Sequence, residues 1–378
     1  MSEARVKVLE PTFAPWSPTR DRARQVAVLM SGGVDSSVTA LLLVQADWDV
    51  LGITMKVPVC DSNPRGCCGA EAAFVCQDLG IPHYFVDVTE AFRALIIEPF
   101  RQAYREGRTP NPCIDCNSLM KFSLVWDLLE QEFGIQHLAT GHYACVVRTL
   151  EDVRLCRARD KAKDQSYFLY GIPRDRLNYL DLPLGGLSKQ EVRRIARDRG
   201  LPVADRPESM ELCFVGEGDY RQALDDDLRR QYGDLIDMQG NKIGTHRGIA
   251  HYTLGQRRGL GYAGGRPLYV ARIDPAANTV TLGTRDQVCT RLVTAGHVHA
   301  LYPKACAAGQ QVRAKIRSYG DPKPCRIVDF SADYVTVRFE EPEFAPCPGQ
   351  GLVIYDDQDC VIAGGTIHEQ TPFQIARE

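Results

Sequence analysis

The sequence predicts an α/β fold in its first half, then a small polar region and a C-terminal antiparallel β-barrel. Two patterns predict this arrangement. Short apolar runs alternate with helical segments between Gln25 and Gly200, which is typical of a parallel sheet covered on both faces. After Leu268, short β-like runs follow one another between turns, which is typical of a small barrel.

Each element of the first half rests on a local signal. Short apolar runs predict strands at Gln25–Met30, Val50–Met55, His83–Val88 and His137–Thr140. Longer segments predict helices at Val38–Gln45, Glu71–Leu79, Thr89–Tyr104, Phe122–Glu132 and Ser188–Arg199. The last helix has clear boundaries, because Ser188 can cap it, Glu191 lies three residues further on, and Gly200 can end it.

The second half is expected to be mostly strands. They are predicted at Leu268–Ile273, Thr279–Leu282, Gln311–Ile316, Cys325–Phe330, Tyr334–Phe339, Gly351–Tyr355 and Val361–Thr366. We therefore divide the chain into a loose, proline-containing leader and three domains. Their predicted bounds are 1–24 for the leader, 25–218 for the α/β domain, 219–285 for the central domain and 286–378 for the barrel.

Composition excludes several classes of protein. The 378 residues are 44% hydrophobic with a net charge of −3, so a strongly basic nucleic-acid protein is excluded, although local basic faces are not. No apolar run approaches the ~18 residues that a membrane helix needs. The N-terminus has no apolar secretory core, and a long chain with 14 cysteines fits a reducing compartment better than a disulfide scaffold. We expect a cytoplasmic protein without a membrane partner.

A glycine-rich loop carries the clearest chemistry. The run Ser31-Gly32-Gly33-Val34-Asp35-Ser36-Ser37 follows the first predicted strand and opens the first helix. Glycines let the backbone approach an anion, and the N–H groups and helix dipole favour phosphate. Asp35 could orient a metal ion or cap the helix. The loop lacks the lysine of the G-x-x-x-x-G-K-[ST] motif, so nothing in it is placed to assist transfer of a γ-phosphate.

Three cysteines stand in unusual surroundings. Cys113 and Cys116 lie in the run 109–117, where prolines and asparagines predict a loop, and Cys213 lies in the run 209–216. Arg108 and Lys121 flank the first pair, and nearby cations lower a thiol pKa. The residues alone leave open a redox pair, a three-thiolate site, or half of a zinc site without a second pair at the right spacing. Incidental burial is the expected role of the other scattered cysteines: Cys145, Cys156, Cys289, Cys306, Cys325, Cys347 and Cys360.

Together these motifs resemble a known family. The glycine-rich loop resembles the pyrophosphatase loop (PP-loop) of the N-type ATP pyrophosphatases, which cleave ATP between the α and β phosphates and adenylate an oxygen. The cysteine-containing runs resemble the tRNA-specific 2-thiouridylases (the MnmA family) within that superfamily. Further matching runs are Gly141–Ala144, Lys163–Phe168, His251–Gly261 and Val312–Ser318.

The resemblance implies ATP-dependent 2-thiolation of the wobble uridine (position 34) of tRNA. ATP would adenylate the uracil C2 oxygen, and a persulfide sulfur would displace AMP. Cys213 would carry the persulfide, and Cys116 would release its sulfur by forming a disulfide with Cys213. Mg²⁺ should accompany ATP. The sulfur donor would be a cysteine desulfurase, a sulfur-relay protein or free sulfide.

The resemblance also assigns binding residues. The ATP site would comprise Leu29, Met30, Ser31, Gly32, Gly33, Val34, Asp35, Ser36, Met55 and Gly141. The target base would meet Asn111, Pro112 and Cys113. The tRNA would meet Lys163, Asp164, Gln165, Gln256, Arg257, Arg258, Arg317 and Ser318. Basic residues near aromatic ones suit phosphate contact and base stacking.

Two departures from the family pattern matter. Cys113 stands where many members carry an aspartate that contacts the base or handles a proton, and Ser318-Tyr319 stands where Tyr-Arg is common. With Cys113 a cysteine, an alternative is open: Cys113, Cys116 and Cys213 as ligands of a [4Fe-4S] cluster that binds sulfide. Soft thiolate ligands permit either route. We assign no role to Cys67 and Cys68.

Two other functions compete. Another PP-loop enzyme could adenylate a carboxylate or an amide, and it would not need Cys116 or Cys213. A non-catalytic iron–sulfur sensor that binds RNA would form no AMP. Neither alternative explains the loop, the cysteines and the basic runs together.

Overall fold

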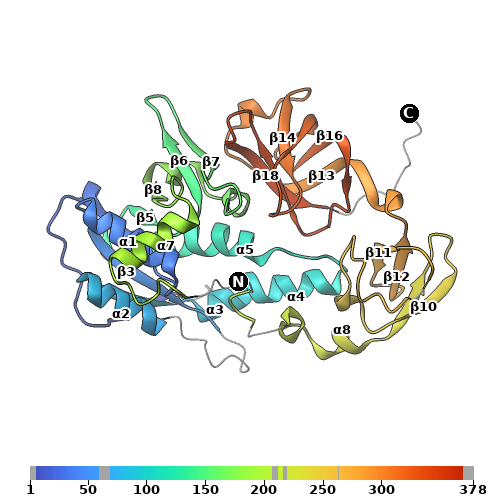
Figure 1. Ribbon diagram of the computed structural model, residues 1–378, viewed down its shortest axis with the longest axis horizontal. Helices are drawn as coiled ribbons and strands as arrows, with labels where there is room; N and C mark the ends of the chain where they lie inside the picture. The colour runs from blue at the N-terminus through green and yellow to red at the C-terminus, as the bar shows by residue number, and fades with distance from the viewer. Residues whose placement is uncertain (1–5, 59–68, 207–211, 216–218, 263, 369–378) are drawn as a thin grey trace. The chain divides into compact units, whose positions relative to one another are not determined.

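The computed structural model describes residues 6–58, 69–206, 212–215, 219–262 and 264–368 (Figure 1). Cys67 and Cys68 lie outside these ranges. The chain forms two units. Unit 1 contains residues 1–96, 113–218 and 358–361, and unit 2 contains residues 97–112, 219–357 and 362–378. The predicted domain boundaries remain predictions.

Unit 1 is built on a sheet in the order β1-β4-β3-β2-β5-β8. Its strands are β1 (Lys7–Pro11), β2 (Gln25–Leu29), β3 (Asp49–Lys56), β4 (His83–Asp87), β5 (His137–Ala139) and β8 (Leu180–Asp181). All neighbours pair in parallel except β1, which is antiparallel to β4. The chain moves outward from β2 in both directions, so β2 marks the point where such sheets bind ligands at their carboxyl ends.

Helices cover this sheet, as the alternation of apolar runs predicts. Val26 and Val28 of β2 pack with Val38 of α1 (Val34–Gln45), Ala72 of α2 (Gly69–Leu79) and Val192 of α7 (Lys189–Asp198). The alternate residues of β2 are also buried, so both faces of the strand are covered. The predicted cap of α7 is confirmed, since the Ser188 side chain accepts from the Glu191 amide in a capping box.

Two local expectations for unit 1 are wrong. Part of the expected leader is the edge strand β1, and the Thr19 and Arg20 amides each donate to Asp49 at 2.6 Å. The expected loop at 109–117 becomes helical from Pro112, because proline suits the first turn of a helix, where its missing N–H costs nothing. The helical segment comprises α5 (Pro112–Asp115), the π-helical η3 (Cys116–Val125) and α6 (Trp126–Phe133). A similar succession forms α3 (Thr89–Phe92), η2 (Arg93–Ile97) and α4 (Glu98–Arg105).

A two-stranded antiparallel ribbon completes the sheets of unit 1. It consists of β6 (Ala144–Arg148) and β7 (Val153–Arg157), with Cys145 opposite Cys156. The Lys163–Gln165 run, the first of the predicted tRNA contacts, follows β7 along the chain.

Unit 2 contains a small sheet and a closed barrel. The sheet order is β10-β9-β12-β11, from β9 (Gly233–Ile236), β10 (Lys242–His246), β11 (Tyr269–Asp274) and β12 (Thr279–Gly283), with α8 (Asp226–Arg230) before it. The barrel order is β13-β16-β15-β14-β17-β18. Its strands are β13 (Cys289–Ala300), β14 (Gln311–Lys315), β15 (Lys323–Phe330), β16 (Tyr334–Phe344), β17 (Gly351–Tyr355) and β18 (Val361–Ile367). The predicted antiparallel barrel is confirmed, and β13 and β18 close it.

Apolar side chains fill the barrel. Val293, Ile327, Val337 and Leu352 are fully buried in it, and charged residues alternate with them outward. None of the described helices is long and apolar enough to cross a membrane.

Candidate active site

The glycine-rich loop joins β2 to α1 at the carboxyl edge of the parallel sheet. Gly32 has φ 71°, a left-handed conformation that glycine adopts without strain. Gly33 precedes α1 and has no side chain to cap it. The N–H groups of the first turn therefore have no side-chain cap that would compete with an anion. The backbone conformation is compatible with an anion-binding loop, and phosphate binding there stays a prediction.

The loop hydroxyls hold the loop itself. The Ser36 hydroxyl donates to the Gly33 carbonyl at 3.1 Å and accepts from the Ser31 amide at 3.2 Å. The Ser37 hydroxyl donates to the same carbonyl at 2.9 Å. Leu29, Met30, Val34 and Ser36 are buried, whereas Ser31 is exposed and Gly33 and Asp35 are partly exposed. These last three are the loop residues that solvent reaches most readily.

Asp35 has a partner that the sequence does not reveal. Lys189, the first residue of α7, donates to both carboxylate oxygens of Asp35 at 2.7 and 2.8 Å. The Tyr143 hydroxyl donates to Asp35 at 2.8 Å, and the Lys189 ammonium lies 5.6 Å from the Tyr143 ring centroid. Lys189 is 8% exposed. A lysine therefore reaches the loop from α7, 154 residues further along the chain.

Two other predicted ATP residues lie beside this loop. A Cβ on Gly141 would lie 2.8 Å from the Ser36 nitrogen, so only glycine lets the β5 end approach the first turn of α1. Met55 lies near the end of β3. The neighbouring Thr54 hydroxyl donates to the Met30 carbonyl at 2.9 Å. Strand ends and loop therefore gather at one edge of the sheet.

The three candidate cysteines influence one another. Cys113 and Cys116 are on the helical segment that begins at Pro112, and Cys213 precedes Phe214, whose ring packs 5.8 Å from that of Phe92. The charges of Cys113 and Cys116 each raise the pKa of Cys213. Folding therefore brings Cys213 near the pair, although the sequence separates them widely.

The expected activation of these thiols by cations is wrong for the protein alone. Burial raises the pKa of Cys113 and Cys116, and it raises the pKa of Cys213 to about 12. Lys121 lowers each thiol pKa as predicted, but desolvation outweighs it. Arg108 instead contacts Glu106. Solvent reaches the Cys113 and Cys213 side chains, yet enough protein surrounds them to favour the neutral thiol.

Two further groups lie close to these thiols: Asp115, which no motif of the sequence singles out, and His142, which belongs to the matching run Gly141–Ala144. Burial raises the pKa of Asp115, and its charge raises the pKa values of Cys113 and Cys116. A carboxylate with a raised pKa is a better proton acceptor than an ordinary aspartate. Its signal was its place two residues after Cys113, where the family aspartate is replaced. His142 accompanies them: burial lowers its pKa well below 6.5, and Lys121 lowers it further.

The cysteines do not form a metal-ligand group in the described part of the chain, where no set of three His, Cys, Asp or Glu side chains could hold a metal ion. The donor chemistry of three thiols suits a [4Fe-4S] cluster, but this arrangement does not.

The predicted tRNA run after β7 is organised by Asp164. This carboxylate, 9% exposed, accepts from the Arg157 guanidinium at 3.0 Å and from the Ala158 amide at 3.1 Å. The Ser166 hydroxyl also donates to it at 3.0 Å. Asp164 therefore holds the loop from inside. Gln165 accepts from the Tyr143 amide at 2.9 Å, which ties this run to the partner of Asp35. Contact of Lys163 and Gln165 with tRNA stays a prediction.

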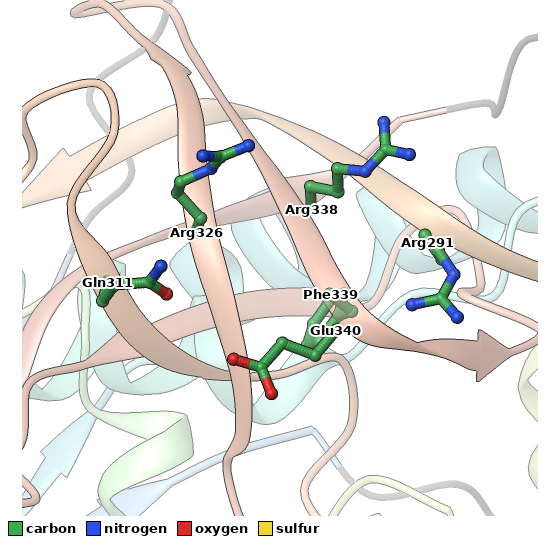
Figure 2. Close-up of a pocket in the computed structure, with 6 residues that line it drawn as sticks. All are labelled: Arg291, Gln311, Arg326, Arg338, Phe339 and Glu340. Carbon is green, nitrogen blue, oxygen red and sulfur yellow. The ribbon is translucent and has the colours of Figure 1, made fainter. Parts of the chain in front are cut away.

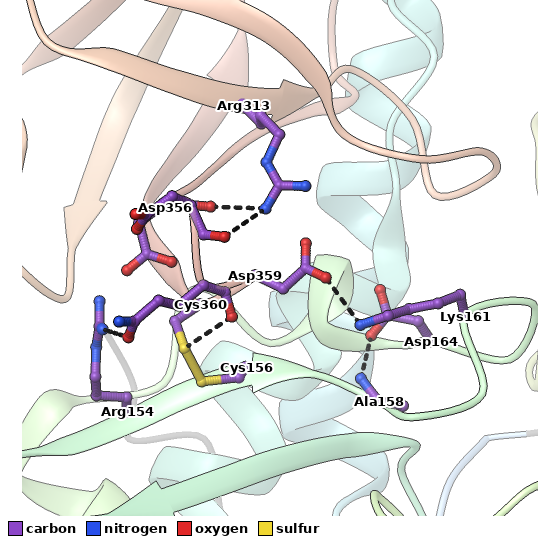
Figure 3. Close-up of a disulfide and its surroundings, with 11 residues drawn as sticks. Arg154, Cys156, Ala158, Lys161, Asp164, Arg313, Asp356, Asp359 and Cys360 are labelled. Atoms are coloured by element: carbon purple, nitrogen blue, oxygen red, sulfur yellow. Dashed lines mark hydrogen bonds and ion pairs between the residues drawn. A yellow bond between two sulfur atoms is a disulfide. The ribbon is translucent and has the colours of Figure 1, made fainter.

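A disulfide joins this region to a distant segment. Cys156 of β7 is bonded to Cys360, 204 residues later (Figure 3). Both residues are buried, and Asp359 pairs with Arg157 at 3.5 Å and with Lys161 at 2.9 Å. The expected incidental role of Cys156 and Cys360 is therefore wrong. The two cysteines are 204 residues apart in the sequence, so no spacing rule could pair them.

The residues of unit 2 that are predicted to contact tRNA differ in exposure and in their hydrogen-bond partners. Gln256 braces its own turn by accepting from the Thr253 amide at 3.0 Å, whereas Arg257 and Arg258 are exposed. Arg317 donates to the Phe344 carbonyl, and the Ser318 carbonyl accepts from Lys315 at 2.7 Å. The Asn111 amide approaches Gln350 at 3.4 Å. The tRNA and target-base roles of these residues, and that of Pro112, stay predictions.

Comparisons with known proteins show the family to which the chain belongs. Residues 24–217 match the model of the tRNA methyl transferase HUP domain. Residues 221–284 match the tRNA methyl transferase PRC-barrel domain, and residues 290–367 match the aminomethyltransferase beta-barrel domain. A relative from Syntrophus aciditrophicus, named tRNA-specific 2-thiouridylase MnmA 1, is 42% identical over 92% of this chain and 93% of its own length. The chain belongs to the tRNA-specific 2-thiouridylase family.

Other members give the same result. The tRNA-specific 2-thiouridylase MnmA of Lachnoclostridium phytofermentans is 40% identical over 91% of this chain and 99% of its own length. The tRNA-specific 2-thiouridylase MnmA of Azorhizobium caulinodans is 40% identical over 92% of this chain and 94% of its own length. Among solved structures, the U34-tRNA thiolase NcsA from Methanococcus maripaludis is 19% identical, covers 50% of this chain and 60% of its own, and has a TM-score of 0.33. A likeness that weak supports no argument about the site.

Proposed function

We propose that this chain is an ATP-dependent tRNA-uridine 2-sulfurtransferase that converts the wobble uridine of tRNA to 2-thiouridine. The observation that carries the proposal is the approach of Cys213 to Cys113 and Cys116, in the same unit as the anion-binding loop. The family's curated members, which match over nine-tenths of the chain, support the same reaction. A carboxylate-adenylating enzyme would leave this group of thiols without a use.

The loop at the start of α1 would bind the phosphates of ATP. Its N–H groups and the helix dipole favour the developing charge on pyrophosphate. Lys189 would add a positive charge at Asp35. The C2 oxygen of uracil would attack the α-phosphorus, forming the adenylated base and releasing pyrophosphate. The carbonyl oxygen becomes part of AMP, a good leaving group.

Sulfur transfer would then use both cysteines. The terminal sulfur of a Cys213 persulfide attacks C2 and expels AMP, which leaves a Cys213–S–S–C2 linkage. The Cys116 thiolate attacks the Cys213 sulfur and breaks that S–S bond, so the outer sulfur stays on the base as the 2-thio group. A Cys116–Cys213 disulfide results. A dithiol reductant supplies two electrons to restore the thiols.

Asp115 would handle protons for this exchange. The Cys116 thiol must lose its proton before it attacks, and the raised pKa of Cys116 makes a nearby acceptor necessary. Cys113 cannot act as a carboxylate in the place of the family aspartate. Asp115 offers that carboxyl group two residues away. Asp115→Asn should therefore slow sulfur release more than AMP formation.

Mg²⁺ would be held chiefly by ATP. It prefers phosphate and water oxygens with one or two carboxylates, and the one carboxylate of the loop, Asp35, already contacts Lys189. Its role would be to neutralise the departing pyrophosphate. We further propose tRNA with a wobble uridine as substrate, a desulfurase, relay protein or sulfide as sulfur source, and the cytoplasm as location.

Mass spectrometry of nucleosides tests the proposal. Unmodified tRNA would be incubated anaerobically with the protein, Mg-ATP, a dithiol and either a persulfide donor or free sulfide. We expect a gain of sulfur for oxygen at the wobble uridine in the persulfide arm. Product only with sulfide and a reconstituted cluster would reject the persulfide route, and no thiouridine in either arm would reject the function.

Variants sharpen this test. Cys116→Ala and Cys213→Ala should each abolish thiouridine while AMP formation with tRNA continues. Cys289→Ala is the matched control, because Cys289 is a partly exposed free thiol in the other unit, and it should retain full yield. Full yield from Cys213→Ala would contradict the assigned roles.

A further inference from the structure

We propose that the outer face of the barrel carries a second anion-binding surface, and that its ligand is the phosphate backbone of tRNA. The proposal rests on the tRNA substrate argued above, but none of its residues belongs to the predicted tRNA-contact runs. We call this surface the arginine row. It comprises Gln311, Arg326, Arg338 and Arg291 (Figure 2).

The register of the barrel creates the row. Gln311 of β14 lies opposite Arg326 of β15, and Arg326 lies opposite Arg338 of β16. Residues directly opposite each other share a face of the sheet. The buried neighbours Cys325, Val337 and Phe339 point into the barrel, so the two arginines point outward. Figure 2 shows their guanidinium groups extending the same way from adjacent strands.

The two central arginines lack a compensating anion. Both are exposed, and within the described ranges neither Arg326 nor Arg338 has an acidic side chain within ion-pairing distance. Glu340 lines the same hollow, but its carboxylate points away from the paired guanidinium groups in Figure 2. Like charges directly opposite each other destabilise an antiparallel pair. An anion between them would remove that cost.

The surroundings favour a phosphodiester over a single small ion. Arg291 of β13 borders the same hollow, and its contact to Glu341 is long, at 3.8 Å, with Glu341 86% exposed. The hollow, of about 220 Å³, is open and extends across several strands. A guanidinium binds phosphate through two parallel N–H bonds. A row of such groups therefore fits successive phosphates of one strand better than one isolated ion.

The charge of the whole protein makes local basic surfaces important for binding RNA. With a net charge of −3, the chain repels RNA at long range unless local basic surfaces offset this. An acidic protein would also be attracted by the row. RNA is favoured because the curated relatives are named for tRNA. In addition, an RNA strand presents phosphates one after another, and the arginine row presents guanidinium groups one after another.

Binding of full-length unmodified tRNA tests the inference. Fluorescence anisotropy would be recorded over a range of salt for the wild type and for Arg326→Gln/Arg338→Gln in the full chain. We expect roughly 10-fold weaker binding at low salt, and a log–log salt slope shallower by about 1 to 2, because each phosphate contact contributes about 0.9 or less to that slope. Lys at both positions should restore much of the slope.

The matched control is Arg174→Gln/Arg197→Gln, which removes the same charge. These arginines are 55% and 56% exposed and pair with Asp152 and Asp205 at 3.0 and 2.9 Å. An equal loss of tRNA affinity in both double variants would overturn the inference. An unchanged salt slope for tRNA in the Arg326→Gln/Arg338→Gln variant would also overturn it. Weaker binding of polyglutamate by that variant, with tRNA binding unchanged, would indicate an acidic protein as the ligand and so reject RNA. Thiouridine yield of the wild type is measured separately, so failure of the proposed reaction is distinguishable from failure of this surface.

Discussion

Replacing Lys189 by methionine removes the cation that holds Asp35 at the start of α1. Methionine keeps most of the side-chain volume, so the change isolates the charge. Breaking a fully buried ion pair from one side costs ~3–5 kcal/mol. The Asp35 side chain is 32% exposed, so water compensates part of this, and we expect a loss of about 1–2 kcal/mol of unfolding free energy.

The functional effect should be larger than the effect on stability. If Lys189 supplies charge to pyrophosphate as it leaves, its loss should slow AMP formation roughly 100-fold, the effect of removing one donor aimed at developing charge. Because this charge matters most in the transition state, kcat should fall more than the KM for ATP rises. Lys189→Arg should recover a substantial part of kcat.

The assay is AMP release with saturating tRNA and Mg-ATP, together with urea unfolding of each variant. Lys242→Met serves as the matched control, because Lys242 is 58% exposed and pairs with Asp234 at 2.6 Å in the other unit. A folded Lys189→Met protein with wild-type kcat and KM would refute the reasoning and leave the lysine a purely structural role.

Three further predictions concern packing, protonation and the disulfide. Gly141→Ala should abolish ATP binding, measured by calorimetry, because its Cβ would meet the Ser36 nitrogen at 2.8 Å; Gly186→Ala, with nothing within 4 Å, should bind normally. Burial lowers the pKa of His83 to about 4, because the folded protein accommodates the neutral ring better than the charged one. The free energy of unfolding should therefore be highest above pH ~6.5 and should decrease as pH falls toward 4, by about 2 kcal/mol between pH 7 and 5. Urea unfolding at both pH values should show this loss in the wild type, and an equal loss in His83→Asn would contradict it. Reducing the Cys156–Cys360 bond should lower unfolding free energy by about 2–4 kcal/mol, whereas the double serine variant should not respond to dithiol.

Local chemistry made the nucleotide loop predictable. The predicted strand Gln25–Met30 differs from β2 by one residue, and the helix begins within the motif itself. Every signal involved, apolar run, glycine pair and helix start, lies within about a dozen residues. The barrel was predictable as a class for the same reason, since its strands are short and their alternation is local.

Long-range pairings were not predictable. Lys189 donates to Asp35, which lies 154 residues earlier in the sequence. In the sequence, Lys189 simply follows the helix cap Ser188, so it resembles any residue in the first turn of a helix. Burial also reversed the sign expected for the thiols, because a flanking lysine is visible in a sequence while the surrounding protein density is not. Only the folded chain shows which of the two effects is larger.

Two elements were misread for local reasons. The prolines around Pro112 predict a loop because prolines usually interrupt helices, whereas a proline at the first position of a helix favours it. Strand β13 was missed entirely. It carries Gly296, a positive φ of 49° at His297 and irregular register on both sides, so its residues do not alternate in the simple way that predicts a strand.

The Cys156–Cys360 bond closes a covalent ring that contains most of unit 2 and the end of unit 1. A protease that cuts the backbone anywhere between these cysteines would therefore produce two fragments that still migrate as one molecule until a thiol is added. Unit 1 also depends on residues 358–361, so a fragment ending at residue 218 would lack both Cys360 and the Asp359 carboxylate that faces Arg157. Limited digestion, with and without reductant, would show this connectivity directly on a gel.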